Sequence, residues 1–180
     1  MVRSLGLGTY IQANGLTQSG GIVESMWKDT LRKVRGSKSE IRNVLILGLG
    51  GGTVAKLIRK YWPGAKITGV DIDPIIVELG RKYLNLDGDI EIKIQDAAKF
   101  VPGRYDLVIV DLYRGDEFPK KFEDEKFLKS LTKNKLIIFN RLYYKEKKIK
   151  ALEFGKKLQK IFSKVNYFYP VSNLMFVCSK

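Results

Sequence analysis

The stretch Val44-Leu45-Ile46-Leu47-Gly48-Leu49-Gly50-Gly51-Gly52-Thr53 decides the fold of this chain. Apolar residues lead into a turn with four glycines in five positions, and the apolar spacing typical of a helix follows at once. A strand, a glycine turn and a helix in this order let the backbone approach a ligand closely and point N–H groups at it. The pattern predicts a nucleotide-type site. The alternative, a tight turn without a ligand, does not need this many glycines.

The spacing of these glycines separates the turn from two common phosphate-binding motifs. The dinucleotide fingerprint has its third glycine one position later, where Thr53 stands. No Gly-Lys-Ser/Thr follows the turn, which excludes a P-loop.

Short apolar runs alternate with amphipathic segments after residue 42. The predicted strands are 44–47, 67–70, 90–94, 107–110 and 136–139, with a final strand pair over 165–169 and 174–178. The predicted helices are 53–61, 74–84, 122–131 and 145–162. This alternation predicts an α/β, Rossmann-like fold with a mostly parallel, twisted sheet and helices on both faces.

The first forty residues follow a different pattern. Residues 10–13 and 16–18 flank Asn14-Gly15, which predicts a short β-hairpin with a type I′ turn. Residues 21–34 have the apolar spacing of an amphipathic helix. We therefore expect two units, a hairpin with a linking helix over 1–40 and a nucleoside-binding domain over 41–180.

Composition excludes several classes of chemistry. The 180 residues are 44% hydrophobic and 29% charged, as in a globular protein, with a net charge of +14. The absence of His and the single Cys178 exclude His-dependent metal sites, Ser-His-Asp triads and zinc clusters, so we expect no metal.

No apolar run is long enough to span a membrane, and no signal segment opens the chain, so we expect a cytoplasmic protein.

Acidic residues follow three of the predicted parallel strands, at the sheet edge where such folds bind ligands. Asp71, 19 residues beyond Gly52, is placed to accept hydrogen bonds from ribose hydroxyls, and Ile72 is assigned to the same cofactor site. Asp73 is a helix N-cap before a proline. Asp96, beside Ala97, is a candidate to accept a hydrogen bond from the amino group of an adenine. The alternative for Asp71 is a solvated strand end.

Asp111 comes directly after the strand 107–110, which places it at the same edge. A carboxylate there can accept a proton from an amine or orient it toward an electrophile. Hydrogen bonding to nearby loop amides is an equally weighted alternative.

Four motifs together resemble the spermidine synthases and the related spermidine-synthase-like methyltransferases. They are Gly48-Leu-Gly-Gly-Gly-Thr-Val, Val70-Asp-Ile-Asp73, Val77-Glu-Leu-Gly-Arg-Lys-Tyr-Leu84 and Tyr105-Asp-Leu-Val-Ile-Val-Asp111, within a similarity over residues 10 to 140. The resemblance implies a class I methyltransferase fold and a thioether-nucleoside site for S-adenosylmethionine or its decarboxylated form. It implies the following roles: Gly48, Gly50 and Gly52 near the sulfonium chain, Asp71 on the ribose, Asp96 with Ala97 at the adenine, and Asp111 as the catalytic aspartate.

The chain departs from that pattern where the amine substrate would bind. Gly51 stands in place of the donor-holding Asp, Arg114 follows Asp111 where the family has a second Asp, and the amine-binding Tyr has no counterpart in 20–27. The departures favour methyl transfer to an unidentified nucleophile, with Asp111 orienting or deprotonating it. Aminopropyl transfer to an amine is the alternative, and a non-catalytic nucleoside- or nucleic-acid-binding relative is the third hypothesis. Substitute carboxylates would be Glu24, Asp116 and Glu117 if their side chains converge on Asp111.

The carboxyl-terminal third is strongly basic. Residues 133–180 hold twelve Lys or Arg and two acids, Glu146 and Glu153. We expect Ile149, Leu152, Leu158, Ile161 and Phe162 to face the sheet and the lysines from Lys147 onward to form a solvated helix face. Nucleic-acid binding is the less favoured interpretation. The expected partners are a small nucleophilic substrate, with nucleic acid on the basic third and a homodimer left open, and no membrane.

Overall fold

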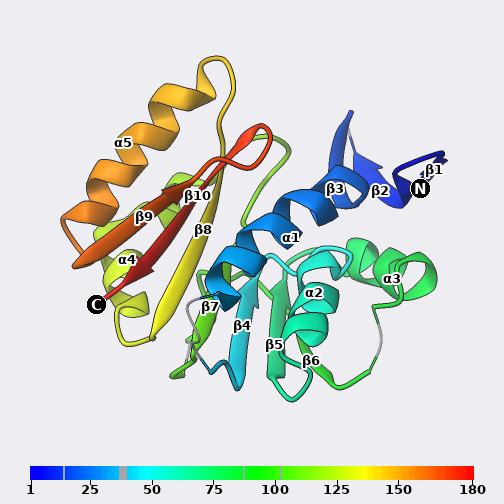
Figure 1. Ribbon diagram of the computed structural model, residues 1–180, viewed down its shortest axis with the longest axis horizontal. Helices are drawn as coiled ribbons and strands as arrows, with labels where there is room; N and C mark the ends of the chain where they lie inside the picture. The colour runs from blue at the N-terminus through cyan, green and yellow to red at the C-terminus, as the bar shows by residue number, and fades with distance from the viewer. Residues whose placement is uncertain (14, 37–39, 87, 102) are drawn as a thin grey trace.

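The computed structural model describes residues 1–13, 15–36, 40–86, 88–101 and 103–180 (Figure 1). A small antiparallel sheet opens the chain, with strands β1 (Val2–Ser4), β2 (Gly8–Ala13) and β3 (Leu16–Gly20). The predicted pairing of the second and third strands is confirmed. The turn expected at Asn14 lies outside the described residues. Strand β1 was not predicted from the sequence.

The main sheet has seven strands in the order β6-β5-β4-β7-β8-β10-β9. Their bounds are β4 (Asn43–Leu47), β5 (Lys66–Asp71), β6 (Ile90–Ile94), β7 (Leu107–Val110), β8 (Leu136–Leu142), β9 (Lys164–Phe168) and β10 (Asn173–Ser179). The first five strands of this order pair in parallel, and β10 runs antiparallel to both of its neighbours. The predicted Rossmann-like α/β fold with a mostly parallel sheet is confirmed.

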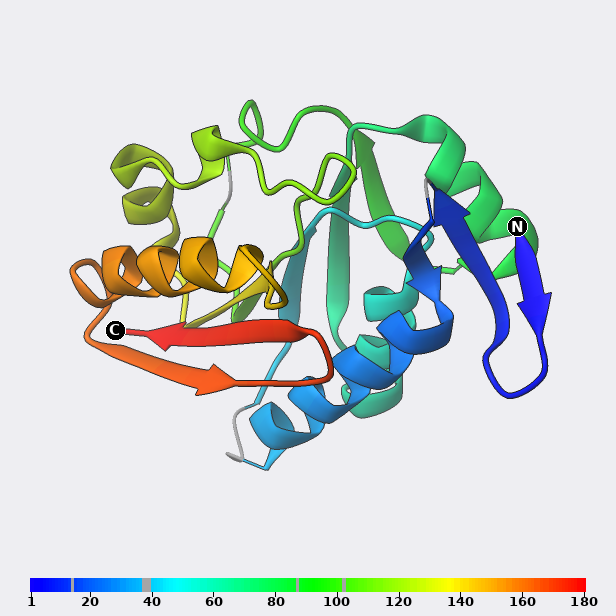
Figure 2. The same cartoon turned by 90° about the horizontal axis from the view of Figure 1, so that it is seen from above.

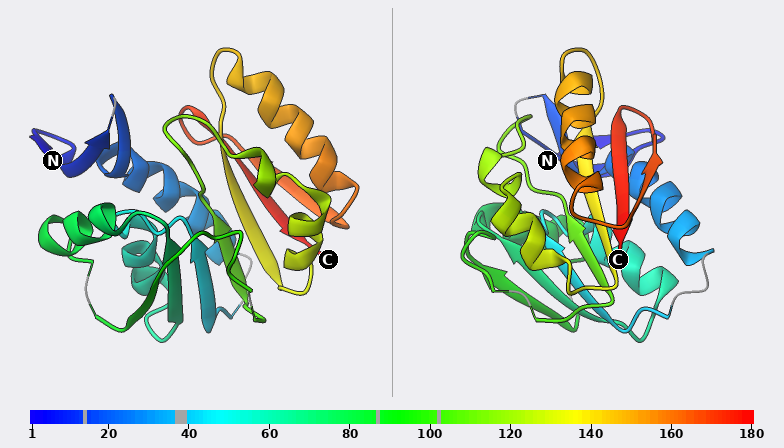
Figure 3. Two further views of the ribbon diagram at one scale, coloured as in Figure 1. Left: turned by 180° about the vertical axis from the view of Figure 1, so that it is seen from behind. Right: turned by 90° about the vertical axis from the view of Figure 1, so that its left-hand side faces the viewer.

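Helices cover both faces of this sheet (Figures 1 and 3). The helical segments are α1 (Gly21–Arg35), α2 (Thr53–Tyr61), α3 (Pro74–Tyr83), the single 3-10 turn η1 (Lys120–Phe122), α4 (Glu125–Leu131) and α5 (Lys147–Gln159). Helices α1 and α2 pack on one face, while α4 and α5 pack on the other. None of the described helices is long and apolar enough to cross a membrane.

Strand β4 shows how the sheet is held between these layers. Val44 and Ile46 pack in the cluster with α1 and α2, while Leu45 and Leu47 pack in the cluster with α4 and α5. All four side chains are buried, and each contributes on the order of 1.5–3 kcal/mol through apolar burial. Because both faces of β4 are covered by helices, the strand is a continuous apolar run and does not alternate with polar residues.

The first helix connects the small sheet to this core. Trp27 and Leu31 of α1 are fully buried in the cluster that covers β4. Figure 2 shows the small sheet beside α3, at the end of the molecule away from β9 and β10. The small sheet therefore lies over the carboxyl ends of the first parallel strands.

Two predicted helices differ from the observed ones. The segment 122–131 divides into η1 and α4, and the predicted helix 145–162 is shorter at both ends. The assigned face of the predicted helix is wrong at its start, where Lys147 is buried and Ile149 and Leu152 are exposed, and right near its end, where Leu158 and Phe162 are buried. Lys147 turns inward because it pairs with two carboxylates, at 2.8 Å from Asp116 and 2.5 Å from Glu117.

Ion pairs also neutralise part of the positive charge of the carboxyl-terminal third. Lys150 pairs with Glu117, and Lys157 with Glu123. Some of the positive charge on α5 therefore holds neighbouring segments of the same chain. Nucleic-acid binding by this region stays a prediction.

Candidate functional site

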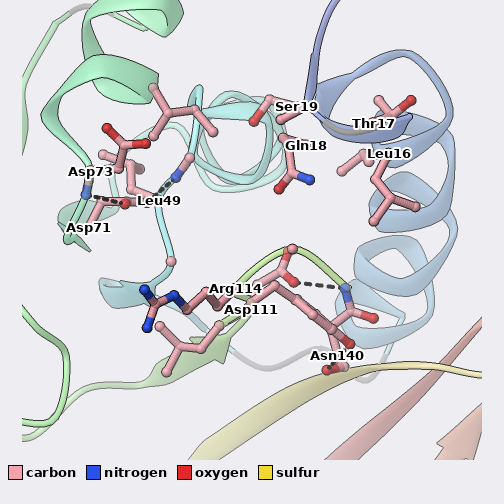
Figure 4. Close-up of a pocket in the computed structure, with 18 of the residues that line it drawn as sticks. Leu16, Thr17, Gln18, Ser19, Leu49, Asp71, Asp73, Asp111, Arg114 and Asn140 are labelled. Atoms are coloured by element: carbon pink, nitrogen blue, oxygen red, sulfur yellow. Dashed lines mark hydrogen bonds between the residues drawn. The ribbon is translucent and has the colours of Figure 1, made fainter. Parts of the chain in front are cut away.

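A cavity of about 1030 Å³ opens at the carboxyl ends of the parallel strands, under the small sheet and α1 (Figure 4). We call one side the turn half: residues 48–50, 71–73 and 95–97 with Lys121. We call the other side the loop half: residues 112–115, Asn140, Leu142, Tyr144 and 171–173. Residues of β3 and α1, among them Gln18 and Met26, close the cavity from the side. Asp111 lies where the two halves meet, because β7 is the central neighbour of β4 and β8.

The glycine turn after β4 needs glycine at its first position. Gly48 has a φ of 89°, a conformation that other residues rarely adopt, and a Cβ there would collide with the carbonyl oxygen of Asp111. The turn can therefore approach the loop after β7 closely.

The N–H groups of this turn are not free, contrary to the expectation that they would point at a ligand. Gly50 donates to Asp71 at 2.6 Å, and Gly51 donates to the Ser19 hydroxyl at 2.7 Å. Gly52, which was also assigned to the cofactor site, does not line the cavity; it donates to the carbonyl of Leu49 at 3.0 Å and packs against Leu86. The turn therefore brings its backbone close to the cavity and holds Asp71 in a fixed position. It does not offer a cluster of free N–H donors to a ligand.

Asp71 is held at the end of β5 by two backbone donors. Its Oδ2 accepts from Gly50, and its Oδ1 accepts from the Asp73 N–H at 3.0 Å. Burial raises the pKa of Asp71, and these hydrogen bonds oppose the rise. Each carboxylate oxygen has a further lone pair, so the pair of oxygens can accept from two vicinal hydroxyls. Asp73 caps α3 by accepting from Ile75 at 2.8 Å, which confirms the predicted N-cap.

The end of β6 supplies a second acidic group and an apolar surface. Asp96 accepts from the Ala98 N–H at 2.9 Å and pairs with Lys121 at 2.5 Å, and the hydrogen bond from Lys121 lowers the pKa of Asp96. Ala97 is buried at the cavity wall, while Ile72 is 67% exposed and also lines the cavity. An exposed isoleucine can pack against the flat face of a purine, while a neighbouring polar group can bond to the edge of its ring. No local pattern indicated that Lys121 would reach Asp96.

Asp111 is fixed by one donor on each carboxylate oxygen. The indole N–H of Trp27 donates to its Oδ2 at 3.0 Å, and the Asn140 amide donates to its Oδ1 at 2.8 Å (Figure 4 shows the latter). Asn140 is held in turn by Asn173, whose amide donates to it at 2.7 Å. Burial raises the pKa of Asp111 to about 6, although both hydrogen bonds act to lower it.

The partners of Asp111 were missed by sequence reasoning. Trp27 follows the apolar spacing of α1, and Asn140 lies within an apolar strand, so neither shows a local sign of contact with a residue 84 or 29 positions away. An asparagine in a buried strand is the one available signal, because a buried amide requires partners.

The carboxylates suggested as substitutes for the missing ones do not converge on Asp111, so that expectation was wrong. Glu24 lies 3.7 Å from Lys56, while Asp116 and Glu117 bind Lys147. None of the three lines the cavity. Their attraction to lysines of α2 and α5 directs them elsewhere.

This arrangement places one proton-accepting carboxylate at the centre of the cavity. With a pKa of about 6, Asp111 is mostly ionised at neutral pH and close enough to that pH to exchange a proton with an amine. Among the described residues, no three His, Cys, Asp or Glu side chains form a group that could hold a metal ion.

Comparison with known proteins gives a consistent result. A family model for the spermine/spermidine synthase domain matches residues 26–172. A probable polyamine aminopropyl transferase of Bifidobacterium longum is 30% identical over 105 residues, which cover 57% of this chain and 24% of that protein. A polyamine aminopropyltransferase of Clostridium perfringens is 34% identical over 120 residues, covering 61% of this chain and 42% of that protein.

Solved structures agree on the fold. The crystal structure of a probable spermidine synthase from Corynebacterium glutamicum has a TM-score of 0.78 at 18% identity, covering 94% of this chain and 71% of that one. The chain spans less than half the length of the curated relatives described above.

Proposed function

We propose, because the chain belongs to the spermine/spermidine synthase family, that it transfers an aminopropyl group from decarboxylated S-adenosylmethionine to an amine. The observation that supports this most directly is Asp111, a carboxylate fixed by two donors at the boundary between the two halves of the cavity. The turn half would hold the nucleoside, and the loop half would hold the amine.

The residues of the turn half fit an adenosine with a sulfonium chain. Asp71 presents both carboxylate oxygens to the ribose hydroxyls, and Asp96 lies near the adenine edge beside the apolar surface of Ile72. Gly48 and Gly50 line the cavity, and their lack of a side chain lets the turn pack closely against the Asp111 carbonyl and Ser19; the sulfonium chain would pass beside this turn. These roles are part of the proposal.

Asp111 would prepare the nucleophile. An amine reaches the cavity as an ammonium ion, and loss of a proton to Asp111 frees its lone pair. The nitrogen then forms a bond to the propyl carbon, the carbon–sulfur bond breaks, and the electron pair stays on the sulfur of methylthioadenosine. The chain's contribution is largely the positioning of the two reactants, which a preformed cavity favours.

Family membership reverses the order of the two transfer hypotheses. The departures at Gly51 and Arg114 favoured methyl transfer, but the relatives described above carry aminopropyltransferase names. The missing donor-holding Asp at Gly51 is the specific observation that still points to methyl transfer. The two reactions leave different products, so one assay separates them.

The test is to incubate the protein with decarboxylated S-adenosylmethionine and a set of amines, and in parallel with S-adenosylmethionine, and to measure the released thioether. We expect amine-dependent methylthioadenosine. The variant Asp111→Asn should lower kcat about a hundredfold or more and leave methylthioadenosine affinity nearly unchanged, because it removes a general base but no nucleoside contact.

The matched control is Asp89→Asn, which alters an exposed acid outside the cavity and should leave kcat unchanged. Release of S-adenosylhomocysteine without methylthioadenosine would overturn the proposal in favour of methyl transfer. Release of neither product would leave the chain as a non-catalytic relative.

A further inference from the structure

The loop half holds a charged group that the proposed reaction has not used. Arg114 lines the cavity, and Figure 4 shows its side chain extending from the loop that carries Asp111, with the guanidinium on the side away from Asn140. Among the described residues its guanidinium has no ion-pair or hydrogen-bond partner. Its backbone pairs with Glu117 in both directions, at 2.9 and 3.2 Å, so the position of the residue on the loop is fixed.

A guanidinium that lines a cavity and has no ion-pair partner there favours the binding of an anionic group. Its planar donors match the two oxygens of a carboxylate, and the bond between them is stronger than one between neutral groups. Lys121, the other cationic side chain of the described lining, already binds Asp96. Arg114 is therefore the cation that remains available to a ligand within the described lining.

The carboxylates of the cavity cannot serve a second ammonium group in the loop half. Apart from Asp111, the acids of the described lining all lie in the turn half and already have partners. Those partners are Gly50 and Asp73 for Asp71, Ile75 for Asp73, and Lys121 for Asp96. A diamine in the loop half would place its far ammonium near Arg114, and removing such a charge from water without a counter-charge is costly.

The charge of the whole chain acts in the same direction. A net charge of +14 repels small polycations and attracts anions over distances of about a Debye length. The electrostatic field of the whole chain and the charge of Arg114 in the loop half thus both disfavour a ligand with two or more positive charges.

We infer that the acceptor is an amine that carries a carboxylate at its other end, with the amine at Asp111 and the carboxylate at Arg114. This inference rests on the proposed aminopropyl transfer and names its substrate class. The bonds change as in the proposed reaction: the carbon–nitrogen bond forms, the carbon–sulfur bond breaks, and the ammonium proton passes to Asp111. The acceptor's carboxylate takes no part in the bond changes and only fixes its orientation.

The experiment compares three acceptors of equal chain length that differ at one end: δ-aminovalerate, n-pentylamine and cadaverine. Methylthioadenosine release is measured with decarboxylated S-adenosylmethionine as donor. We expect kcat/KM to be highest for δ-aminovalerate, by about tenfold or more over n-pentylamine, which is the size of one charged hydrogen-bonded contact. Cadaverine should be the poorest of the three.

Two variants and one control test the role of Arg114. Arg114→Gln should abolish the preference for δ-aminovalerate, and Arg114→Glu should make cadaverine the best acceptor. The control Arg104→Gln removes the same charge from an exposed residue that does not line the cavity, and it should keep the wild-type order.

A binding titration separates failure of this inference from failure of the proposed function. In protein saturated with methylthioadenosine, δ-aminovalerate should bind more tightly than cadaverine, and Arg114→Gln should remove the difference. If no amine releases methylthioadenosine, the proposed transfer is wrong, and this titration still decides the ligand class. If cadaverine is the best substrate or ligand of the wild-type protein, the inference is overturned and the transfer stands.

Discussion

The two halves of the cavity hold opposite kinds of charge. In the turn half, Asp71, Asp73 and Asp96 lie at or just beyond the ends of strands β5 and β6, and each carboxylate is fixed by backbone or lysine donors. The described lining of the loop half has Arg114 as its charged side chain. The comparison teaches that one cavity can combine a half rich in acidic groups with a half whose charged side chain is a cation, so the two halves suit ligand groups of different charge. Asp111 lies between the two halves and is shared by both.

The largest expected effect concerns the buried charge of Asp111 at this boundary. Its pKa is about 6 in the folded chain against an ordinary value of 3.8, so between these values the folded state holds a proton that the unfolded state releases. Stability therefore falls as pH rises through this window, by up to about 3 kcal/mol. Urea unfolding at about pH 4 and pH 8 should show this component in the wild type and not in Asp111→Asn.

The comparison between wild type and Asp111→Asn isolates this component, because the other titrating groups are common to both proteins. An amide at this position would face the donors Trp27 and Asn140, and that cost does not vary with pH. Identical pH dependence in the two proteins would mean that water reaches Asp111 freely, and the boundary between the halves would then be as polar as the turn half.

The second prediction tests whether the turn half acts on the nucleoside alone. Asp71→Ala should weaken methylthioadenosine binding by about tenfold to a hundredfold, because it removes charged hydrogen bonds of about 1.5–3 kcal/mol. The KM for the acceptor should change little. Calorimetric titration measures the first quantity and initial rates the second, with the exposed Asp89→Ala as the control. Unchanged nucleoside affinity would show that the ribose does not bind at Asp71.

Apart from Lys121, the turn half was predictable because its residues follow directly from the local sequence. A glycine-dense turn after a buried strand, and an Asp after each of the next two, share one sheet edge whatever the remaining chain does. Asp71, Asp96 and Asp111 all line the cavity as expected. The N-cap at Asp73 was predictable for the same reason, since it depends on the next two residues.

The loop half depended on contacts between distant segments. Asn140 reaches Asp111 only because β8 pairs with β7, and Trp27 reaches it only because α1 packs over β4. The inward turn of Lys147 likewise depends on where the loop after β7 places Asp116 and Glu117. Helical spacing alone assigned this lysine to the solvent, since no local pattern marks a buried ion pair.

The third prediction concerns the anchoring of the loop half. Lys147→Met removes a side chain that is 8% exposed and leaves Asp116 and Glu117 without their lysine. Both carboxylates are about half exposed, so we expect a measurable loss of stability that is smaller than for a fully buried pair. The KM for the acceptor should rise while nucleoside affinity is kept, because these pairs hold the loop that carries Arg114.

Lys148→Met is the matched control for this anchoring, because Lys148 is an exposed lysine of the same helix. Thermal unfolding and acceptor titration of both variants decide the question. Equal behaviour of the two would show that the ion pairs of Lys147 do not hold the loop in place.

The smallest expected effect is at Lys121, where η1 contacts the turn half. The Lys121 side chain is 46% exposed, so its pair with Asp96 is screened by solvent and contributes at most about 1 kcal/mol. Lys121→Gln should weaken methylthioadenosine binding by less than about fivefold, and raising the salt concentration should reduce the difference from the wild type. A neutral Lys120→Gln variant, altered at an exposed neighbour outside the cavity lining, should bind like the wild type. A loss as large as that of Asp71→Ala would mean that Lys121 binds the nucleoside itself, and the turn half would then hold a cation of its own for the ligand, as the loop half does in Arg114.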